Sequence, residues 1–474
     1  MKFSLVPVLA LGAVYLSGSA TVYADSRIKV TIGDVDCDGL CHGNVVVLCM
    51  ENRSFDHLLG WWAKTRQDVA VDGVPAGAHN VLSQNGMVID ALPNASYIQQ
   101  SPDHSVAGVT TELYGLGANT MNPGPNPATM SGFVDANSIE WNSTDPSILH
   151  MAMDGYNTSA LPITFTLANE YAVFDKWFAA VPGPTFPNRL FLTSGTSQGM
   201  YFNDAKQIAE GFPQKSIFGH LQDNSVSWKN YYGQFPTSLV FKDVRNIIDI
   251  LFKIRPMSSF YDDAREGNLP AFSYIDPILL SLPGVNANDN HPPHDVALGE
   301  LLVKNVYEAL RASPQWKQTL FIITYDEHGG FWDHVPPPTK NVPSPDNVSN
   351  SSTFFRFDRL GVRVPTIMIS PWIKKGRVVS YPQNGPTPDS QFEHSSLPAT
   401  LNKYFNLNGF LTARDAWAAP FDFITNELSA PRTDCPATLP NPPKVSPQNF
   451  VKDAEGQWTE IITIAESLLA GKTP

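Results

Sequence analysis

Charged residues are scarce in this chain, and basic residues are scarcest. Of the 474 residues 16% are charged, and 32 lysines and arginines face 45 aspartates and glutamates, giving a formal net charge of −13. The sequence contains no cluster of lysine and arginine and no RNA-binding signature. Because an acidic surface repels nucleic acid and anionic bilayers, we exclude nucleic acid as a partner. The hydrophobic share of 42% is enough for a large core and excludes a disordered chain.

Cysteine is also rare, with four residues and no C-x-x-C pair, which argues against a four-cysteine zinc site. Cys37 and Cys41 are close enough for a small loop disulfide in an oxidising compartment. Cys49 lies in an apolar run and is predicted to be a buried thiol. The partner of Cys435 is open.

Long apolar segments are absent beyond the N-terminus. Lys2 is the only charge before Asp25, an apolar run covers residues 5–16, and small residues stand at 22 and 24. This pattern predicts a signal peptide over 1–24 and a secreted protein; the run ends too early for a full membrane span. A eukaryotic secreted chain could carry sugars at Asn94, Asn142, Asn157, Asn347 and Asn350, which fit the acceptor pattern.

Repeats and low-complexity tracts are missing too, while 40 prolines and 32 glycines predict many ordered loops, most clearly over 119–127 and 336–352. We expect one catalytic domain over 25–436. A C-terminal extension over 437–474 follows, with an amphipathic helix at about 449–469 whose apolar stripe should pack on the domain.

Several continuous β-branched runs predict parallel strands that are buried on both faces. These runs cover 44–50, 272–275, 320–325 and 364–369. Helical stretches separate them, for example 294–311 and 390–405. The alternation predicts an α/β fold with a mostly parallel sheet.

Polar side chains follow two of these strands, Glu51 and Asn52 after one and Asp326 and Glu327 after another. Ligands bind at the carboxyl ends of parallel strands. Neighbouring carboxylates there raise each other's pKa unless a cation lies between them, so these four residues predict a divalent metal site. The alternative is a set of ordinary helix caps and loop acids.

Thr185 lies in the segment 182–189, where it could cap a helix that runs to about residue 193. Its hydroxyl would then lie at a helix N-terminus, which favours phosphate; the plainer interpretation is an N-cap threonine alone. His104 and His291 could supply charge and an acid for phosphoryl transfer, or could be loop histidines without a catalytic role.

The chain resembles the phosphoesterase family that contains non-specific phospholipases C of plants and bacteria and a bacterial acid phosphatase. Residues 51–57, Glu-Asn-Arg-Ser-Phe-Asp-His, resemble the family signature, and the blocks at 182–189, 288–292, 324–330 and 391–396 follow in family order. The resemblance runs from about residue 43 to 436. It implies a three-layer α/β/α fold of the alkaline-phosphatase kind with a mostly parallel central sheet.

The resemblance also implies residue roles. Glu51, Asn52, Asp326 and Glu327 match metal ligands, and Thr185 matches the nucleophile. His104 and His291 match histidines on the phosphate or leaving group. Asp103, Asp289 and His394 fall in blocks that look like the rim of the site, where they would bind substrate, or like the residues that support its ligands. Threonine excludes the formylglycine of sulfatases, although the Thr-x-Pro-x-Arg spacing is similar to their nucleophile motif.

The expected activity is phospholipase C-type cleavage of glycerophospholipids, with contact to a membrane surface. The alternatives are a phosphomonoesterase that uses the same residues and, less favoured, an inactive secreted binding protein. The metal could be Mg, Ca, Mn or Zn, and the oligomeric state is open. The aromatic residues Trp228, Tyr231, Tyr232 and Phe235 are a candidate apolar entrance, or else core. Residues 276–282 depart from the plant enzymes.

Overall fold

The computed structural model describes residues 43–119, 121, 127–346 and 355–446. The predicted signal peptide over 1–24, the pair Cys37 and Cys41, the acceptor sites Asn347 and Asn350 and the helix over 449–469 lie outside these residues. No helix in the described ranges has both the length and the hydropathy to cross a membrane.

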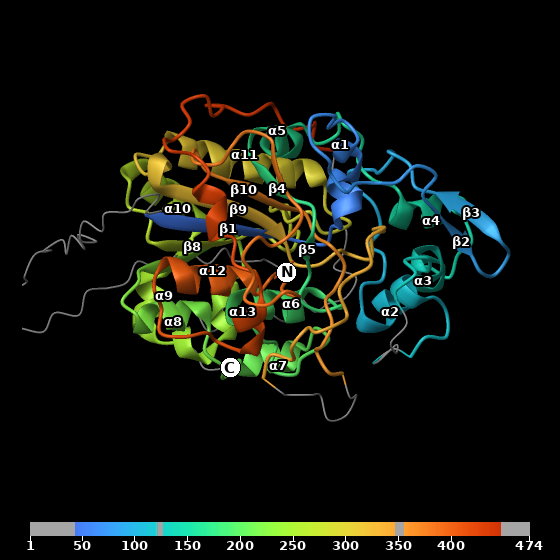
Figure 1. The fold of residues 1–474 in the computed structure, drawn as a ribbon, viewed down its shortest axis with the longest axis horizontal. Helices are drawn as coiled ribbons and strands as arrows, with labels where there is room; N and C mark the ends of the chain where they lie inside the picture. Colours follow the sequence, from blue (N-terminus) through green and yellow to red (C-terminus); the bar gives the residue numbers. More distant parts are fainter. Residues whose placement is uncertain (1–42, 120, 122–126, 347–354, 447–474) are drawn as a thin grey trace, which may run out of the picture. The chain divides into compact units, whose positions relative to one another are not determined.

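An eight-stranded sheet forms the centre of the catalytic unit, in the order β11-β4-β10-β9-β1-β8-β6-β7 (Figure 1). Its strands are β1 (Asn44–Met50), β4 (Ala172–Phe174), β6 (Trp228–Tyr232), β7 (Ile254–Pro256), β8 (Phe272–Asp276), β9 (Thr319–Tyr325), β10 (Thr366–Ile369) and β11 (Arg377–Val379). Two small sheets pair β5 (Trp177–Phe178) with β12 (Phe392–Glu393), and β2 (His79–Leu82) with β3 (Met87–Asp90).

The prediction of a mostly parallel sheet is confirmed, with one exception. Strand β10 is antiparallel to both of its neighbours, β9 and β4. The prediction of a parallel strand over 364–369 was therefore wrong in direction, and the strand begins only at Thr366. A continuous apolar run indicates burial on both faces, and this requirement is the same for either strand direction.

Strand β1 lies in the middle of the sheet, and all seven of its residues are buried. It pairs in parallel with β8 on one side and β9 on the other, so Val45 faces Phe272 and Leu320. Cys49 within it is a buried free thiol, as predicted, and burial raises its pKa to about 12. Cys435 is also a buried free thiol.

Helices cover both faces of this sheet, which gives the predicted three layers (Figure 1). One face carries α5 (Pro162–Glu170), α10 (Met257–Glu266) and α11 (Val296–Ala312), and the other carries α6 (Thr185–Ser194), α8 (Ile217–Asp223) and α12 (Ser396–Tyr404). A separate small core joins the β2–β3 hairpin to α2 (Val106–Tyr114), α3 (Phe133–Glu140) and α4 (Pro146–Met153).

Shorter elements complete the described chain. They are η1 (Asp56–Gly60), α1 (Trp61–Ala63), α7 (Ala205–Glu210), η2 (Thr237–Val240), η3 (Lys242–Val244), α9 (Ile247–Phe252), η4 (Trp316–Gln318), α13 (Ala413–Trp417) and η5 (Asp422–Thr425).

Two sequence predictions need correction. The helix expected over 390–405 begins only at Ser396, because Phe392 is in a strand that pairs with β5 and stacks on Trp177 at 6.2 Å between ring centroids. Of the two interpretations of the aromatic residues, core is correct and the apolar entrance is wrong for Trp228, Tyr231 and Phe235, which are all at most 3% exposed; Tyr232 is partly exposed. Periodicity does not distinguish a buried aromatic strand from an apolar surface.

The first residues of the expected C-terminal extension pack along α11. The Lys304 ammonium donates to the carbonyl of Leu439 at 2.6 Å, and the Ser446 amide donates to Asp295 Oδ2 at 2.7 Å. The domain boundary at 436 stays a prediction.

Candidate active site

The carboxyl ends of three neighbouring strands bring acidic residues together. Glu51 follows β1, Asp326 and Glu327 follow β9, and Asp276 ends β8. All four side chains are at most 1% exposed. The topology explains the cluster, because β8, β1 and β9 are adjacent and parallel and so end at one edge.

Two loops interlock at this edge. Asn52 adopts a left-handed conformation with φ 56°, and its amide donates to Asp326 Oδ1 at 3.2 Å. Gly329, at φ 68°, packs on the backbone of Asn52, and a Cβ there would lie 2.5 Å from the Asn52 carbonyl oxygen. The amide of Gly329 donates to Glu327 Oε2 at 2.5 Å. Glycine is needed here both for φ and for close approach.

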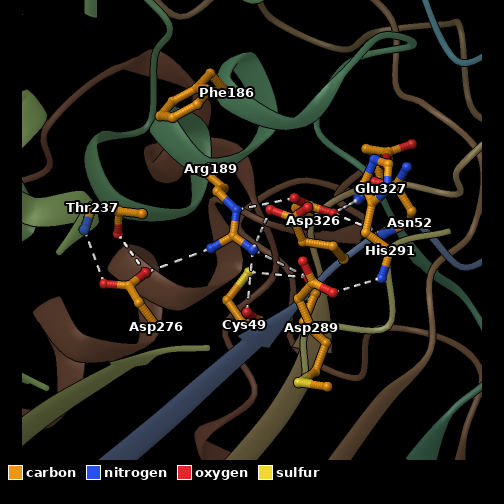
Figure 2. Close-up of polar contacts among 12 residues, drawn as sticks. Cys49, Asn52, Phe186, Arg189, Thr237, Asp276, Asp289, His291, Asp326 and Glu327 are labelled. Carbon is orange, nitrogen blue, oxygen red and sulfur yellow. Dashed lines mark hydrogen bonds and ion pairs between the residues drawn. The ribbon is translucent and has the colours of Figure 1, made fainter. Parts of the chain in front are cut away.

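Arg189 connects these acids, and the sequence did not assign it a role. Its Nε donates to Asp326 Oδ2 at 3.0 Å, its Nη2 lies 3.1 Å from Glu51 Oε1, and its Nη1 lies 3.6 Å from Asp276 Oδ1. Figure 2 shows the guanidinium between Asp276 and Asp326. The Thr-x-Pro-x-Arg spacing was a usable signal, because residues four apart share a helix face.

The buried carboxylates still destabilise one another's charged forms despite this arginine. Burial, with the nearby Asp326 carboxylate, raises the pKa of Glu51 and that of Glu327 well above their usual range. Burial also raises the pKa of Asp326, and Arg189 opposes that shift. One arginine is therefore too little positive charge for this cluster.

Several buried oxygens in the cluster fit a divalent metal. Among the described residues, both oxygens of Glu51, Oδ1 of Asn52 and Oε1 of Glu327 accept no hydrogen bond although they are buried. Asp326 differs, because Oδ1 accepts from the amides of Asn52 and Glu327 and Oδ2 accepts from Arg189. Buried carboxylate and amide oxygens that lack donors are the ligand set of a hard or borderline cation.

Thr185 occupies the first turn of α6, one turn before Arg189 on the same helix. The prediction that Thr185 caps this helix was wrong. Pro184 holds the N-cap position and makes no side-chain cap, and the Phe186 amide in the first turn donates to Asn203 Oδ1 at 3.0 Å. The Thr185 hydroxyl is therefore not committed to that cap, and it lies at the positive end of a helix that reaches the acidic cluster.

The two predicted histidines lie together. The rings of His104 and His291 are 5.9 Å apart between centroids, and His104 Nε2 lies 3.4 Å from Asn52 Nδ2. The other ring nitrogen of His104 donates to the carbonyl of Pro102 at 3.0 Å. Burial and the nearby His104 hold the pKa of His291 well below its usual range. These contacts place both rings beside Asn52.

The three residues expected at the rim make different contacts. Asp289 is fully buried and accepts from the His291 amide at 3.0 Å and from His294 Nδ1 at 2.7 Å. His394 donates from Nε2 to the Asp326 carbonyl at 2.5 Å, and burial lowers its pKa to about 4. Asp103 instead accepts from the Ser105 amide at 2.8 Å, at the start of α2.

A second acidic cluster lies behind the signature segment. Asp56, Asp333 and His334 offer ligand atoms within 4.8 Å of one another. Arg363 contacts both carboxylates there, at 3.1 Å and 2.9 Å. A guanidinium already neutralises these acids, so we interpret the cluster as a buried ion-pair network that fixes the chain after β1.

The chain is similar in sequence to one family of known proteins. The Phosphoesterase family matches residues 43–408. Non-specific phospholipase C6 of Arabidopsis thaliana is 46% identical over 87% of this chain and 76% of its own length. Non-specific phospholipase C1 of the same plant is 44% identical over 84% of this chain and 73% of its own length. Phospholipase C B of Mycobacterium tuberculosis is 27% identical over 84% of this chain and 82% of its own length.

Among solved structures, a protein in the alkaline phosphatase superfamily from Vibrio parahaemolyticus is similar with a TM-score of 0.33 and 13% identity. That similarity covers 64% of this chain and 74% of the other. The family match and the identity to the plant enzymes both extend over most of the chain. The chain therefore belongs to the Phosphoesterase family and is a hydrolase of phosphoric ester bonds.

Proposed function

We propose that this chain is a secreted phospholipase C-type enzyme that cleaves glycerophospholipids to diacylglycerol and a phosphorylated head group. One observation carries the proposal. Helix α6 begins with Thr185, and one turn later its Arg189 contacts Glu51 and Asp326 in the buried acidic cluster. A hydroxyl at a helix N-terminus next to a metal-competent cluster is the arrangement that phosphoryl transfer requires.

In this proposal Thr185 is the nucleophile. Its oxygen attacks phosphorus and forms a phosphothreonine ester while the bond from phosphorus to the glycerol oxygen breaks. His104 or His291 takes the proton that the Thr185 hydroxyl loses and passes it to the leaving diacylglycerol oxygen. A water molecule then hydrolyses the ester, releases the phosphorylated head group and restores the hydroxyl.

Glu51, Asn52, Asp326 and Glu327 would hold a divalent cation, either Mg, Ca, Mn or Zn. When bound, it supplies positive charge that favours an ionised hydroxyl and stabilises the phosphoryl oxygens. Arg189 would orient Glu51 and Asp326 toward the cation, because its guanidinium forms ion pairs with both carboxylates from one side.

The names of the similar proteins support the lipid substrate, because the plant and mycobacterial relatives are all called phospholipases C. The intact Glu51, Thr185, Asp326 and Glu327 argue against an inactive binding protein. The N-terminal pattern supports secretion, and sequencing the N-terminus of the exported protein should give Asp25 as the first residue.

The test is an assay of the purified chain on phosphatidylcholine and on p-nitrophenyl phosphate. Release of diacylglycerol supports the proposal, and activity confined to the monoester replaces it with a phosphomonoesterase.

The nucleophile has its own test. Thr185→Ala should lose roughly 10³-fold or more in turnover. The control Thr193→Ala removes a hydroxyl from the same helix, one that bonds only the Arg189 carbonyl at 2.7 Å, and should retain most activity. Near-normal activity of Thr185→Ala would overturn the assignment.

A further inference from the structure

The segment between β8 and Asp289 lies at the edge of the sheet that carries the site. Its base is closed by Asn288, whose amide donates to the Ile278 carbonyl at 2.9 Å and whose Oδ1 accepts from the Ile278 amide at 2.7 Å. On either side of this base, Asp276 faces Arg189 in the acidic cluster, and the Asp289 carbonyl accepts from the Glu51 amide at 2.9 Å. The loop is therefore fixed to the site at both ends.

A second set of contacts joins this loop to the start of α6. Gln234 exchanges two hydrogen bonds with the backbone of Leu280, at 3.0 Å and 3.3 Å. The next residue, Phe235, packs edge-on against Phe186 at 6.4 Å between centroids. Phe186 directly follows Thr185, so these contacts tie the loop to the first turn of α6.

The tip of the loop is a rigid two-residue hairpin. Leu282 and Val285 exchange backbone hydrogen bonds at 2.8 Å and 2.9 Å across Pro283 and Gly284. Proline sets the first turn position, and Gly284 has the positive φ, 84°, that the second requires. The tip is ordered before it meets any partner.

This tip presents apolar side chains to solvent. Leu282 is 39% exposed and Val285 is 41% exposed, and all five residues from 282 to 286 are exposed. No charged residue occurs from 277 to 288. The chain has a net charge of −13, yet this exposed tip is apolar and carries no charge. Exposed apolar surface of this kind marks an interaction site.

We propose that this hairpin, Leu282 to Val285, inserts into the surface of a zwitterionic phospholipid layer and brings Thr185 to the head groups. The choice of a lipid surface rests on the proposed phospholipase C-type activity. Two large apolar side chains are far too few for a protein interface, which needs about 800 Å² from each partner. A lipid layer surrounds a small tip on all sides, and an uncharged tip fits lipids without net charge.

Helix α9 is the competing surface. Its Ile247, Ile248, Leu251 and Phe252 are 61%, 64%, 53% and 67% exposed. Lys253 at its end stacks on Trp228, the first residue of β6, at 4.9 Å. This contact places the end of α9 at the amino edge of the sheet, opposite the site, so a membrane bound there would not present lipid to Thr185.

The experiment compares hairpin variants of the full chain in two measurements. Binding is measured by flotation of the protein with phosphatidylcholine vesicles. Hydrolysis is measured on those vesicles and on a short-chain phosphatidylcholine that is dissolved as monomers. Leu282→Asp and Val285→Asp place charges at exposed positions, and Ile248→Asp on α9 is the matched control.

We expect each hairpin variant to lose about tenfold or more in vesicle binding and vesicle hydrolysis, with monomer hydrolysis unchanged. Leu282→Trp should bind vesicles more tightly than the parent, because tryptophan favours the membrane interface. Ile248→Asp should behave as the parent does.

Three results would overturn the proposal. Both hairpin variants could bind vesicles as the parent does, Ile248→Asp could lose as much vesicle binding as the hairpin variants, or the hairpin variants could lose as much hydrolysis on monomers as on vesicles. A parent chain that binds vesicles through the hairpin yet hydrolyses no phosphatidylcholine would refute the phospholipase function and leave the docking surface standing.

Discussion

Arg189 gives the sharpest quantitative prediction, because one guanidinium contacts three buried acids. It lies 3.0 Å from Asp326, 3.1 Å from Glu51 and 3.6 Å from Asp276. Replacement by methionine keeps most of the apolar volume and removes the cation. The three carboxylates would then share the cluster with no positive side chain among these contacts.

The expected cost follows from what each acid retains. Asp276 keeps hydrogen bonds from Asn230 and Thr237, and Asp326 keeps two backbone donors. Glu51 keeps no donor among the described residues. Leaving a buried charge without its partner costs about 3–5 kcal/mol, so Arg189→Met should lose this much free energy of unfolding in a metal-free buffer.

The measurement is urea unfolding of parent and variant, first with a chelator and then with saturating divalent cation. The difference should shrink when metal is present, since a bound cation partly replaces the lost guanidinium charge. Arg265→Met is the control: its pair with Asp262 at 2.6 Å is exposed on both sides, and no change in stability is expected. A metal-free difference below about 1 kcal/mol would refute the account of Arg189.

Three further predictions follow from the same structure. Chelation should abolish activity and lower the melting temperature. Adding divalent cation at a hundred times its Kd should restore about 2.7 kcal/mol of the free energy of unfolding. A melting temperature that chelation leaves unchanged would contradict a metal held by the buried oxygens. Burial raises the pKa of Glu300 to about 7, so the folded chain binds its proton more tightly than the unfolded chain and stability falls between about pH 4.5 and 7. The free energy of unfolding of Glu300→Gln, measured with urea, should therefore rise relative to that of the parent by about 3 kcal/mol from pH 4.5 to pH 8. A difference between variant and parent that does not change with pH would contradict this. Gly329→Ala should lose activity and stability, because its Cβ would meet Asn52; Gly77→Ala, at φ 71° with no neighbour within 4 Å, carries only the backbone strain and should keep activity.

The sequence predicted the parts of the fold that depend on burial. The runs at 44–50, 272–275 and 320–325 became β1, β8 and β9 because a strand covered on both faces needs apolar residues throughout. The sequence did not predict the direction of β10 or the residue at which α12 begins. The antiparallel β10 and the strand at Phe392 depend on partners distant in the chain, which periodicity does not report.

The sequence predicted the acidic residues of the site but not the ion pairs that join them. Glu51, Asn52, Asp326 and Glu327 meet as expected, since strand ends share an edge. Their assigned roles stay predictions, as do those of Thr185, His104 and His291. Asp276 was missed because its role depends on Arg189, which a single acid at a strand end does not reveal. The role of Asp103 stays a prediction as well; its carboxylate accepts from the amide of Ser105, which is the N-cap residue of α2.

The central place of β1 has a consequence for synthesis. The chain is made from its N-terminus, yet Val45 pairs with Phe272 and Leu320, which are made much later. At roughly 5–20 residues per second, this strand, apolar from Val45 to Met50, waits tens of seconds for its neighbours. During that time its unpaired edges can pair with other chains, so the nascent protein is exposed to aggregation at this segment until residue 325 has left the ribosome.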